Sequence, residues 1–302
     1  MDYILWFAKN REVVKFRRVY RDKSINEDRA GVYNWIQLQD GTRRRMTVKE
    51  KAEPESLPSG ARVFRFDNMT SQRGGETTGF PVDVDGDTYT PGKGFWKTNR
   101  PRIQRLLLAG RAVPSGSTLA YVRFIDDFAV YPHANPRTDT GTGSFTDEKI
   151  YVVQTGIKVI ESCLLMTTDP GDLVLDPTCC GSGTTAYVAE QWGRRWITCD
   201  TSRVALALAR ARLMAAKYPY YLLSDSPEGI AKETELTGKT PPDYKTGGDI
   251  RKGFVYKRVL HITLKSIANN PDIRGGMTCE EIDAAIARHA DTETLYDQPY
   301  ED

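Results

Sequence analysis

The sequence predicts an α/β fold, because residues 171–216 alternate between strand-like and helix-like patterns. Residues 173–175 (Leu-Val-Leu) form an apolar run that is too short for a helix and is typical of a buried parallel strand. A turn of small residues follows and leads into a helical pattern. A second apolar strand at 196–199 ends on Asp200, and another helical pattern comes next. This order predicts a strand–helix–strand unit with parallel strands.

The turn of this unit suits a nucleoside-containing ligand. Gly181 and Gly183 allow the backbone to approach a ligand closely, and N–H groups at a helix start are free to face it. Asp200 lies 19 residues after Gly181 and is placed to accept hydrogen bonds from ribose hydroxyls. Residues 181–186 also fit the G-x-G-x-x-[GA] pattern of dinucleotide sites. A phosphate-binding loop is excluded, because no Lys follows the glycines.

A longer string narrows the ligand class. Residues 175–185 (Leu-Asp-Pro-Thr-Cys-Cys-Gly-Ser-Gly-Thr-Thr) resemble the S-adenosylmethionine motif of amino-methylating DNA methyltransferases, which make N6-methyladenine or N4-methylcytosine. Residues 149–172 resemble the helix that those enzymes place directly before this motif, and weaker similarity extends to 253–258 and 2–6. The motif order resembles the β-type arrangement, which includes the methylase subunits of type III restriction–modification systems.

The resemblance implies a Rossmann-like S-adenosylmethionine-dependent methyltransferase fold, with a mostly parallel sheet, helices on both faces and an inserted β-rich target-recognition region. It implies transfer of a methyl group from S-adenosylmethionine to the exocyclic amine of adenine in double-stranded DNA. The cofactor-binding residues that it implies are Asp176, Pro177, Gly181, Ser182, Gly183 and Thr184 around the methionine moiety, and Asp200 on the ribose.

Two features depart from the family pattern. The turn carries one residue more than usual, because Cys179 and Cys180 stand where one small residue is expected. The family's catalytic motif, (Asp/Asn/Ser)-Pro-Pro-(Tyr/Phe/Trp), is absent, and residues 240–244 (Thr-Pro-Pro-Asp-Tyr) have the prolines in the wrong order. We therefore name no catalytic residue, and we expect the chain to be an internal piece of a larger methylase.

Three functions remain open. The first is an S-adenosylmethionine-dependent DNA methyltransferase. The second is a non-catalytic piece that binds DNA, cofactor or both, with a restriction subunit or a second chain that supplies the catalytic motif as its partner. The third is a nicotinamide-dependent oxidoreductase, which predicts binding of NAD. We expect His133, His261 and His289 to be structural or surface residues rather than bases.

The composition is that of a globular protein, with 39% hydrophobic and 27% charged residues and a mean hydropathy of −0.50. No apolar run approaches the roughly 20 residues of a membrane span, and residues 1–4 do not begin a signal peptide. The five cysteines, an odd number without paired spacing, favour a reducing compartment, and we expect a cytoplasmic protein without a metal site.

Charge is unevenly distributed along the chain. Residues 1–112 hold 22 Lys and Arg against 14 Asp and Glu, a net charge of +8, whereas the remaining residues hold 20 against 26, or −6. A basic first third suits binding of a polyanion, although a solvated surface explains the same bias. The basic, β-leaning segment before the cofactor motif resembles in position the family's target-recognition region. The DNA contacts predicted there are Lys97, Arg100, Arg102 and Arg105.

These patterns predict four segments and several elements outside the cofactor unit. Alternation predicts strands at 62–66 and 119–130, and residues 220–223 are a candidate third parallel strand with Asp225 at its tip. Thr278 and Glu281 form a capping-box pattern at the start of a predicted helix. The predicted segments are 1–60 (edge of the catalytic domain plus a basic segment), 61–145 (target recognition), 146–226 (cofactor binding) and 227–302 (C-terminal extension).

Overall fold

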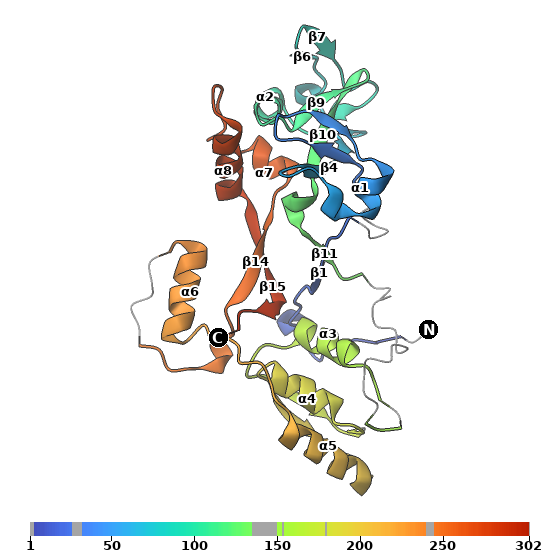
Figure 1. Ribbon diagram of the computed structural model, residues 1–302, viewed down its shortest axis with the longest axis vertical. Helices are drawn as coiled ribbons and strands as arrows, with labels where there is room; N and C mark the ends of the chain where they lie inside the picture. Colours follow the sequence, from blue (N-terminus) through green and yellow to red (C-terminus); the bar gives the residue numbers. More distant parts are fainter. Residues whose placement is uncertain are drawn as a thin grey trace. The chain divides into compact units, whose positions relative to one another are not determined.

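The computed structural model describes residues 3–25, 32–134, 150–152, 154–178, 180–239 and 245–301. They belong to two compact units (Figure 1). Unit 1 consists of Met1–Tyr20, Pro132–Lys257 and Thr294–Asp302, and unit 2 consists of Arg21–Tyr131 and Arg258–Glu293. Two strand pairs carry the chain between the units: β1 (Tyr20–Asp22) with β11 (Val130–Pro132), and β14 (Tyr256–His261) with β15 (Asp291–Pro299).

Both units are discontinuous in sequence, so they cross the boundaries of the four predicted segments (1–60, 61–145, 146–226 and 227–302). Unit 2 joins residues from the first two segments to residues from the last one. The function that we assigned to each segment stays a prediction.

Unit 2 is built on a five-stranded antiparallel sheet with the order β3-β2-β4-β10-β9. The alternating sequence of 62–66 forms β4, as predicted, and its Phe64 faces Phe124 of β10 in register. The strands of the sheet are β2 (Trp35–Gln37), β3 (Arg43–Arg45), β4 (Arg62–Asn68), β9 (Ala112–Ser115) and β10 (Thr118–Phe124). Two smaller antiparallel pairs are β5 (Thr70–Ser71) with β8 (Phe95–Trp96), and β6 (Val82–Val84) with β7 (Asp87–Tyr89).

The helices of unit 2 complete a closed core. They are α1 (Val48–Ala52), α2 (Arg100–Leu108), α7 (Leu264–Ala268) and α8 (Cys279–His289). Ile103 and Leu106 of α2 are fully buried and belong to one cluster with Ile267 of α7 and Ile286 of α8. The capping box predicted for α8 is confirmed, because Thr278 and Glu281 each accept a backbone N–H from the other.

A buried ion pair lies in unit 2. Arg111 donates to both carboxylate oxygens of Asp127, at 2.7 and 2.9 Å, and both side chains are only 2% exposed. Asp127 also accepts the backbone N–H of Phe124, and Arg111 donates to the carbonyl of Val122. Buried charges need such complete pairing, because desolvation costs several kcal/mol per ion.

Unit 1 contains the predicted strand–helix–strand unit. Strand β12 (Leu173–Asp176) pairs in parallel with β13 (Arg195–Thr198), and α4 (Thr184–Gln191) connects them. Val174 and Trp196, on one face of this sheet, pack into a cluster with α3 (Ile157–Thr167) and α4. The other helices of unit 1 are α5 (Arg203–Ala215) and α6 (Pro227–Thr237). Short 3-10 turns in the two units are η1 (Arg11–Val13), η2 (Pro54–Ser56), η3 (Glu76–Thr78), η4 (Ile125–Phe128) and η5 (Ile250–Lys252).

The predicted α/β class is confirmed, but the prediction of a mostly parallel sheet is wrong for the described residues. There, β12–β13 is the parallel pair, and the strands of unit 2 are antiparallel. The candidate third strand, 220–223, does not extend this sheet. Instead, Tyr221 and Leu223 make isolated antiparallel bridges to Glu301 and Phe254. Between them, the N–H of Leu222 donates to the carbonyl of Tyr300, and its carbonyl accepts the N–H of Val255.

Candidate cofactor site

The loop between β12 and α4 requires its glycines. Gly181 and Gly183 have φ angles of 49° and 73°, the left-handed region that glycine adopts at little cost. Gly183 is also the N-cap of α4, and a Cβ atom there would lie 2.8 Å from the Cβ of Ala209 in α5. A side chain at this position would therefore strain the backbone and push α5 away from the loop.

Asp200 lies directly against this loop, as the strand–helix–strand geometry predicts. Its carboxylate accepts the backbone N–H of Gly181 at 2.9 Å and that of Ser202 at 2.8 Å. The Gly181 N–H, and then the Ser202 N–H, lower the pKa of Asp200, so this carboxylate is ionised at neutral pH. Because each carboxylate oxygen has a second lone pair, both oxygens can also accept hydrogen bonds from ligand hydroxyls.

Strand β12 brings Asp176 to the same edge of the sheet. The backbone carbonyl of Asp176 accepts the N–H of Cys199, and Asp176 is in register with Thr198 of β13. Asp176 is half-buried, and Pro177 beside it is exposed. The structure thus places both predicted acids at the carboxyl ends of neighbouring parallel strands, where open α/β sheets bind ligands.

Helix α4 begins at the loop without a side-chain cap, because its N-cap residue is Gly183. Thr184, Thr185 and Ala186 form its first turn, whose N–H groups have no acceptor within the helix. A helix start of this kind favours anionic groups.

The side chains of Ser182 and Thr184 are committed to the loop itself. Their hydroxyl oxygens lie 2.7 Å apart, and both residues are buried. Arg212 of α5 donates to the Ser182 carbonyl and to the Thr184 hydroxyl, each at 3.1 Å, and its guanidinium group lies over the ring of Tyr187. Arg212 therefore holds the loop closed, a role that sequence reasoning missed, since its partners are 28 and 30 residues away.

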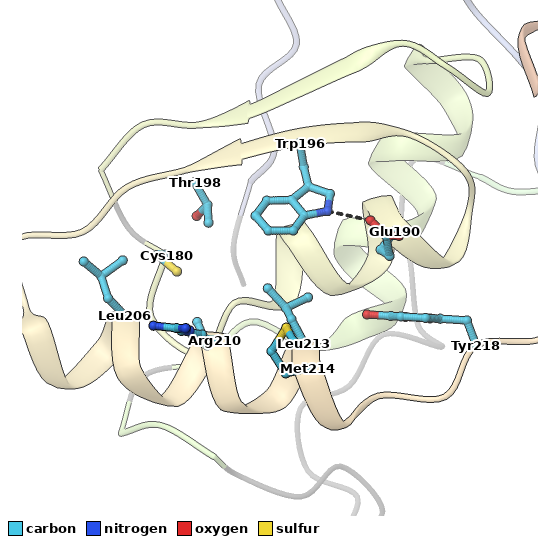
Figure 2. Close-up of a pocket in the computed structure, with 10 residues that line it drawn as sticks. Cys180, Glu190, Trp196, Thr198, Leu206, Arg210, Leu213, Met214 and Tyr218 are labelled. Atoms are coloured by element: carbon cyan, nitrogen blue, oxygen red, sulfur yellow. Dashed lines mark hydrogen bonds between the residues drawn. The ribbon is translucent and has the colours of Figure 1, made fainter.

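The extra residue of the loop involves the two cysteines. Cys179 lies outside the described residues, and Cys180 is buried. Cys180 lines a cavity of about 380 Å³ between β13 and α5, together with Trp196 and Thr198 of β13, Leu206 and Leu213 of α5, and Tyr218 (Figure 2). The side chain of Cys180 therefore points inward rather than toward solvent.

Two hydroxyl groups in this cavity are unsatisfied. The oxygens of Thr198 and Tyr218 are buried and have no hydrogen-bond partner among the described residues. Burial raises the pKa of Tyr218 to about 12, so its hydroxyl keeps its proton. Separately from this cavity, the ionised Asp200 and the uncapped start of α4 fit a ligand that has hydroxyl and anionic parts.

The predicted DNA-contacting residues lie in and beside α2 of unit 2. Arg100 and Arg102 are exposed in its first turn, where cations oppose the helix dipole. Lys97 donates to the carbonyl of Asn68. Arg105 donates to the carbonyl of Ala268 at the end of α7, so it also ties two helices of unit 2 together.

Other sequence candidates have structural partners. Asp225 is buried and accepts hydrogen bonds from Lys252 and from the N–H groups of Gly247 and Asp249, and these donors lower its pKa. It therefore caps a turn. Residues 240–244, which carry the two adjacent prolines, lie outside the described residues.

Two of the histidines, His261 and His289, also have partners within the fold. His261 stacks on Phe128, and His289 lies 3.2 Å from Asp272. Within the described residues, no group of three or more His, Cys, Asp or Glu side chains is placed to hold a metal ion. No helix there is long and apolar enough to cross a membrane.

Two parallel strands that end on acidic residues and are connected by a glycine loop and a helix are typical of α/β proteins that bind nucleotides. Comparison with known proteins narrows this class. Residues 1–211 match the family of N6/N4 DNA methylases, so the chain belongs to the DNA methylase family, as the motif predicts. A segment of 57 residues is 46% identical to the type II methyltransferase M2.DpnII of Streptococcus pneumoniae. That match spans 19% of this chain and 21% of the relative.

Proposed function

We propose that this chain provides the cofactor site and DNA-contacting surface of an S-adenosylmethionine-dependent DNA methyltransferase that modifies the exocyclic amine of adenine. The observation that carries the proposal is the contact between Asp200 and the Gly181 N–H, at the tips of two parallel strands. Family membership supports the same ligand class, since N6/N4 methylation of DNA needs a methyl donor.

The residues of the loop fit the parts of this cofactor. Asp200 accepts hydrogen bonds from the ribose hydroxyls, and the first turn of α4 binds the carboxylate of the methionine moiety. Asp176 attracts the α-ammonium group of that moiety. Gly181 and Gly183 let the backbone come close, while Ser182 and Thr184 keep the loop in shape. When bound, S-adenosylmethionine supplies an activated methyl group on sulfur, so the protein mainly positions the two reactants.

A Rossmann-like methyltransferase fold is the architecture that best accommodates this site. Its support is the parallel β12–β13 pair and the packing of α3 and α4 on one face of that pair. The support for the remaining strands and helices of this fold is the resemblance to the DNA methylase family.

We propose that α2 of unit 2 contacts DNA. Arg100 and Arg102 are exposed at its N-terminal end, where positive charges are unfavourable for the helix. Phosphate oxygens of DNA neutralise these charges when they bind there. Lys97 and Arg105 are part of the same proposed surface. Each also donates a hydrogen bond within unit 2, Lys97 to the carbonyl of Asn68 and Arg105 to that of Ala268. The target base must leave the duplex to reach the methyl donor, as in other enzymes that act on bases.

Calorimetric titration of S-adenosylmethionine, and separately of NAD, tests the proposed ligand. We expect S-adenosylmethionine to bind and NAD not to bind. Asp200→Asn should weaken binding by about 10- to 100-fold, because it removes hydrogen bonds to a charged group, and this factor corresponds to their free-energy contribution. Asp87→Asn, at an exposed position in β7 of unit 2, is the matched control and should bind as the unaltered chain does. Binding of NAD in place of S-adenosylmethionine would contradict the proposal and favour the oxidoreductase alternative.

A further inference from the structure

Two arginines lie directly opposite each other on neighbouring strands of the sheet in unit 2. Arg65 of β4 is in register with Arg123 of β10, and their side chains are 29% and 40% exposed. Like charges in this cross-strand position repel each other and destabilise a sheet. The pair therefore needs a negative charge close to both guanidinium groups.

The carboxylate of Asp67 supplies this charge with poor geometry. Its oxygens lie 3.0 Å from Nε of Arg65 and 2.8 Å from Nε of Arg123, yet among the described residues neither Nε has a hydrogen-bond partner. A terminal nitrogen of Arg65 donates to Asp67 at 3.3 Å, which is longer than usual for an N–H donor. One carboxylate thus serves two guanidinium groups and satisfies neither fully.

A third cation, Lys23, lies close to the same two arginines. Its ammonium group donates to the carbonyl of Phe128, and it lies 5.3 Å from the ring centre of Phe128 and 4.7 Å from that of Tyr131. Burial, and then the charges of Arg123 and Arg65, lower the pKa of Lys23 to about 8. A lysine held this close to two arginines indicates a strongly positive local potential.

The charges around these three residues do not balance. We call Lys23, Arg65 and Arg123 the cation cluster. In the part of the chain that the structure describes, Asp67 is the acid that makes ion pairs with this cluster. Asp127 also acts on Lys23, but it is fully engaged in the buried ion pair described above. Three cations therefore share one available carboxylate, and the cluster favours a further anion.

We propose that the cation cluster is a phosphate-binding site, which takes its phosphate group from the backbone of DNA or from a free phosphate ester. The two guanidinium groups provide planar sets of N–H donors that match phosphate oxygens, and the ammonium group adds a point charge. The cluster shares no residue with α2 or with the glycine loop. Phosphate binding at the cluster does not depend on the proposed function.

Pyridoxal phosphate is a suitable probe, because it carries both a phosphate group and an aldehyde. With its phosphate on the arginines, the neutral amine of Lys23 attacks the aldehyde carbon, a C=N bond forms and water leaves. Borohydride then reduces this bond, and peptide mass spectrometry locates the label. At neutral pH about one in ten Lys23 side chains is neutral. We therefore expect Lys23 to be labelled at least about tenfold faster than Lys49, which is exposed in α1.

Competition against this labelling distinguishes the two sources of phosphate. A short DNA duplex and inorganic phosphate are the two competitors. Slower labelling of Lys23 by DNA, at a lower total phosphate concentration than inorganic phosphate requires, assigns the DNA backbone. Slower labelling by inorganic phosphate alone assigns a free phosphate ester. Labelling of Lys23 that neither competitor slows would overturn the proposal.

Calorimetric titration of inorganic phosphate into variants tests the arginines. Arg65→Gln and Arg123→Gln should each weaken binding about tenfold, because each removes hydrogen bonds to a charged group. Arg73→Gln, at an exposed position elsewhere in unit 2, is the matched control and should leave binding unchanged. Equal binding by the control and by folded Arg65→Gln and Arg123→Gln would contradict the assignment.

Asp67→Asn separates a binding site from a structural ion network. The substitution removes the carboxylate that competes with phosphate, so phosphate binding should become about tenfold tighter. A network with a structural role alone predicts no such gain. Circular dichroism shows whether each variant remains folded. If the arginine variants unfold, Asp67→Asn and the labelling of the unaltered chain still decide, and unchanged or weaker phosphate binding by folded Asp67→Asn would overturn the proposal.

Discussion

The two units differ in how completely they bury their apolar residues. Of the twelve largest fully buried side chains among the described residues, eleven are in unit 2, and Leu165 is the exception. The part of the chain that the structure describes has twenty-one exposed large hydrophobic side chains. Seventeen of them are in unit 1, and the four in unit 2 are Val32, Val48, Leu108 and Leu260. Unit 2 therefore has a complete core, whereas unit 1 holds a well-formed loop on an incompletely covered sheet.

The comparison shows that the geometry of the glycine loop does not require every apolar residue of unit 1 to be buried. The glycine loop is fixed by local contacts with Asp200, Ala209 and Arg212, all from the same strand–helix–strand–helix segment. These contacts do not depend on the exposed side of β12.

The largest expected effect comes from the buried ion pair of unit 2. Arg111→Ala leaves the Asp127 carboxylate buried and unpaired, which should cost about 3–5 kcal/mol in the free energy of unfolding. Urea denaturation measures the loss, and hydrogen exchange followed by mass spectrometry assigns it to unit 2. The double variant Arg111→Met/Asp127→Leu should recover most of the loss. Equal stability of Arg111→Ala and the unaltered chain would contradict the closed core.

A matched pair of leucines tests the difference between the units directly. Leu106→Ala, in the core of unit 2, should cost about 2–5 kcal/mol, because it removes buried contacts and leaves a cavity. Leu175→Ala, on the exposed face of β12, should change the free energy of unfolding by less than about 0.5 kcal/mol. A large effect of Leu175→Ala in urea denaturation would show that this face is covered in the free chain.

Two glycines with similar φ angles, Gly183 in the cofactor loop and Gly116 in unit 2, separate backbone strain from packing. Gly116→Ala, at φ 62° with no atom within 4 Å of the new Cβ, should cost about 1 kcal/mol from backbone strain alone. Gly183→Ala meets the same strain and also the Cβ of Ala209, so we expect a further loss of about 1–3 kcal/mol. Thermal unfolding compares the two variants, and equal losses would mean that α5 moves freely away from the loop.

The smallest expected effect concerns pH and α1 of unit 2. Hydrogen bonds from Arg44, and then from the N–H of Thr47, lower the pKa of Glu50 to about 2. A depressed pKa stabilises the fold above the ordinary glutamate pKa of 4.5, and the contribution is lost as the pH falls toward 2. Glu50→Gln should therefore flatten the dependence of stability on pH between about 4 and 2. An unchanged slope in urea denaturation at those pH values would contradict this role.

The sequence predicted the local features well because their causes are local. The glycine turn, Asp200 at the second strand tip and the capping box of α8 depend on residues within one short segment. Non-local pairing was not predictable in the same way. The antiparallel bridges of Tyr221 and Leu223 depend on backbone of 301 and 254, and the expectation of a parallel third strand was wrong for that reason.

Arg212 illustrates the same limit within the site. As one of several arginines on an exposed helix, it has no distinguishing sequence pattern, yet it joins α5 to the carbonyl of Ser182. Its role follows from the crossing of α4 and α5, which periodicity does not specify. The predicted roles of the loop residues toward a cofactor, and of Lys97 and the α2 arginines toward DNA, stay predictions until binding is measured.

The discontinuity of unit 2 has a consequence for synthesis on the ribosome. The hydrophobic cluster that contains Leu106 and Tyr121 also needs Ile267 and Ile286, which are translated more than a hundred residues later. At the usual rate of chain elongation, the last helix of unit 2 is synthesised on the order of ten seconds after the first part of this unit. Unit 1's glycine loop, with all its partners inside 35 residues, forms long before that moment. In the nascent chain, the proposed cofactor site therefore precedes the domain proposed to bring it to DNA.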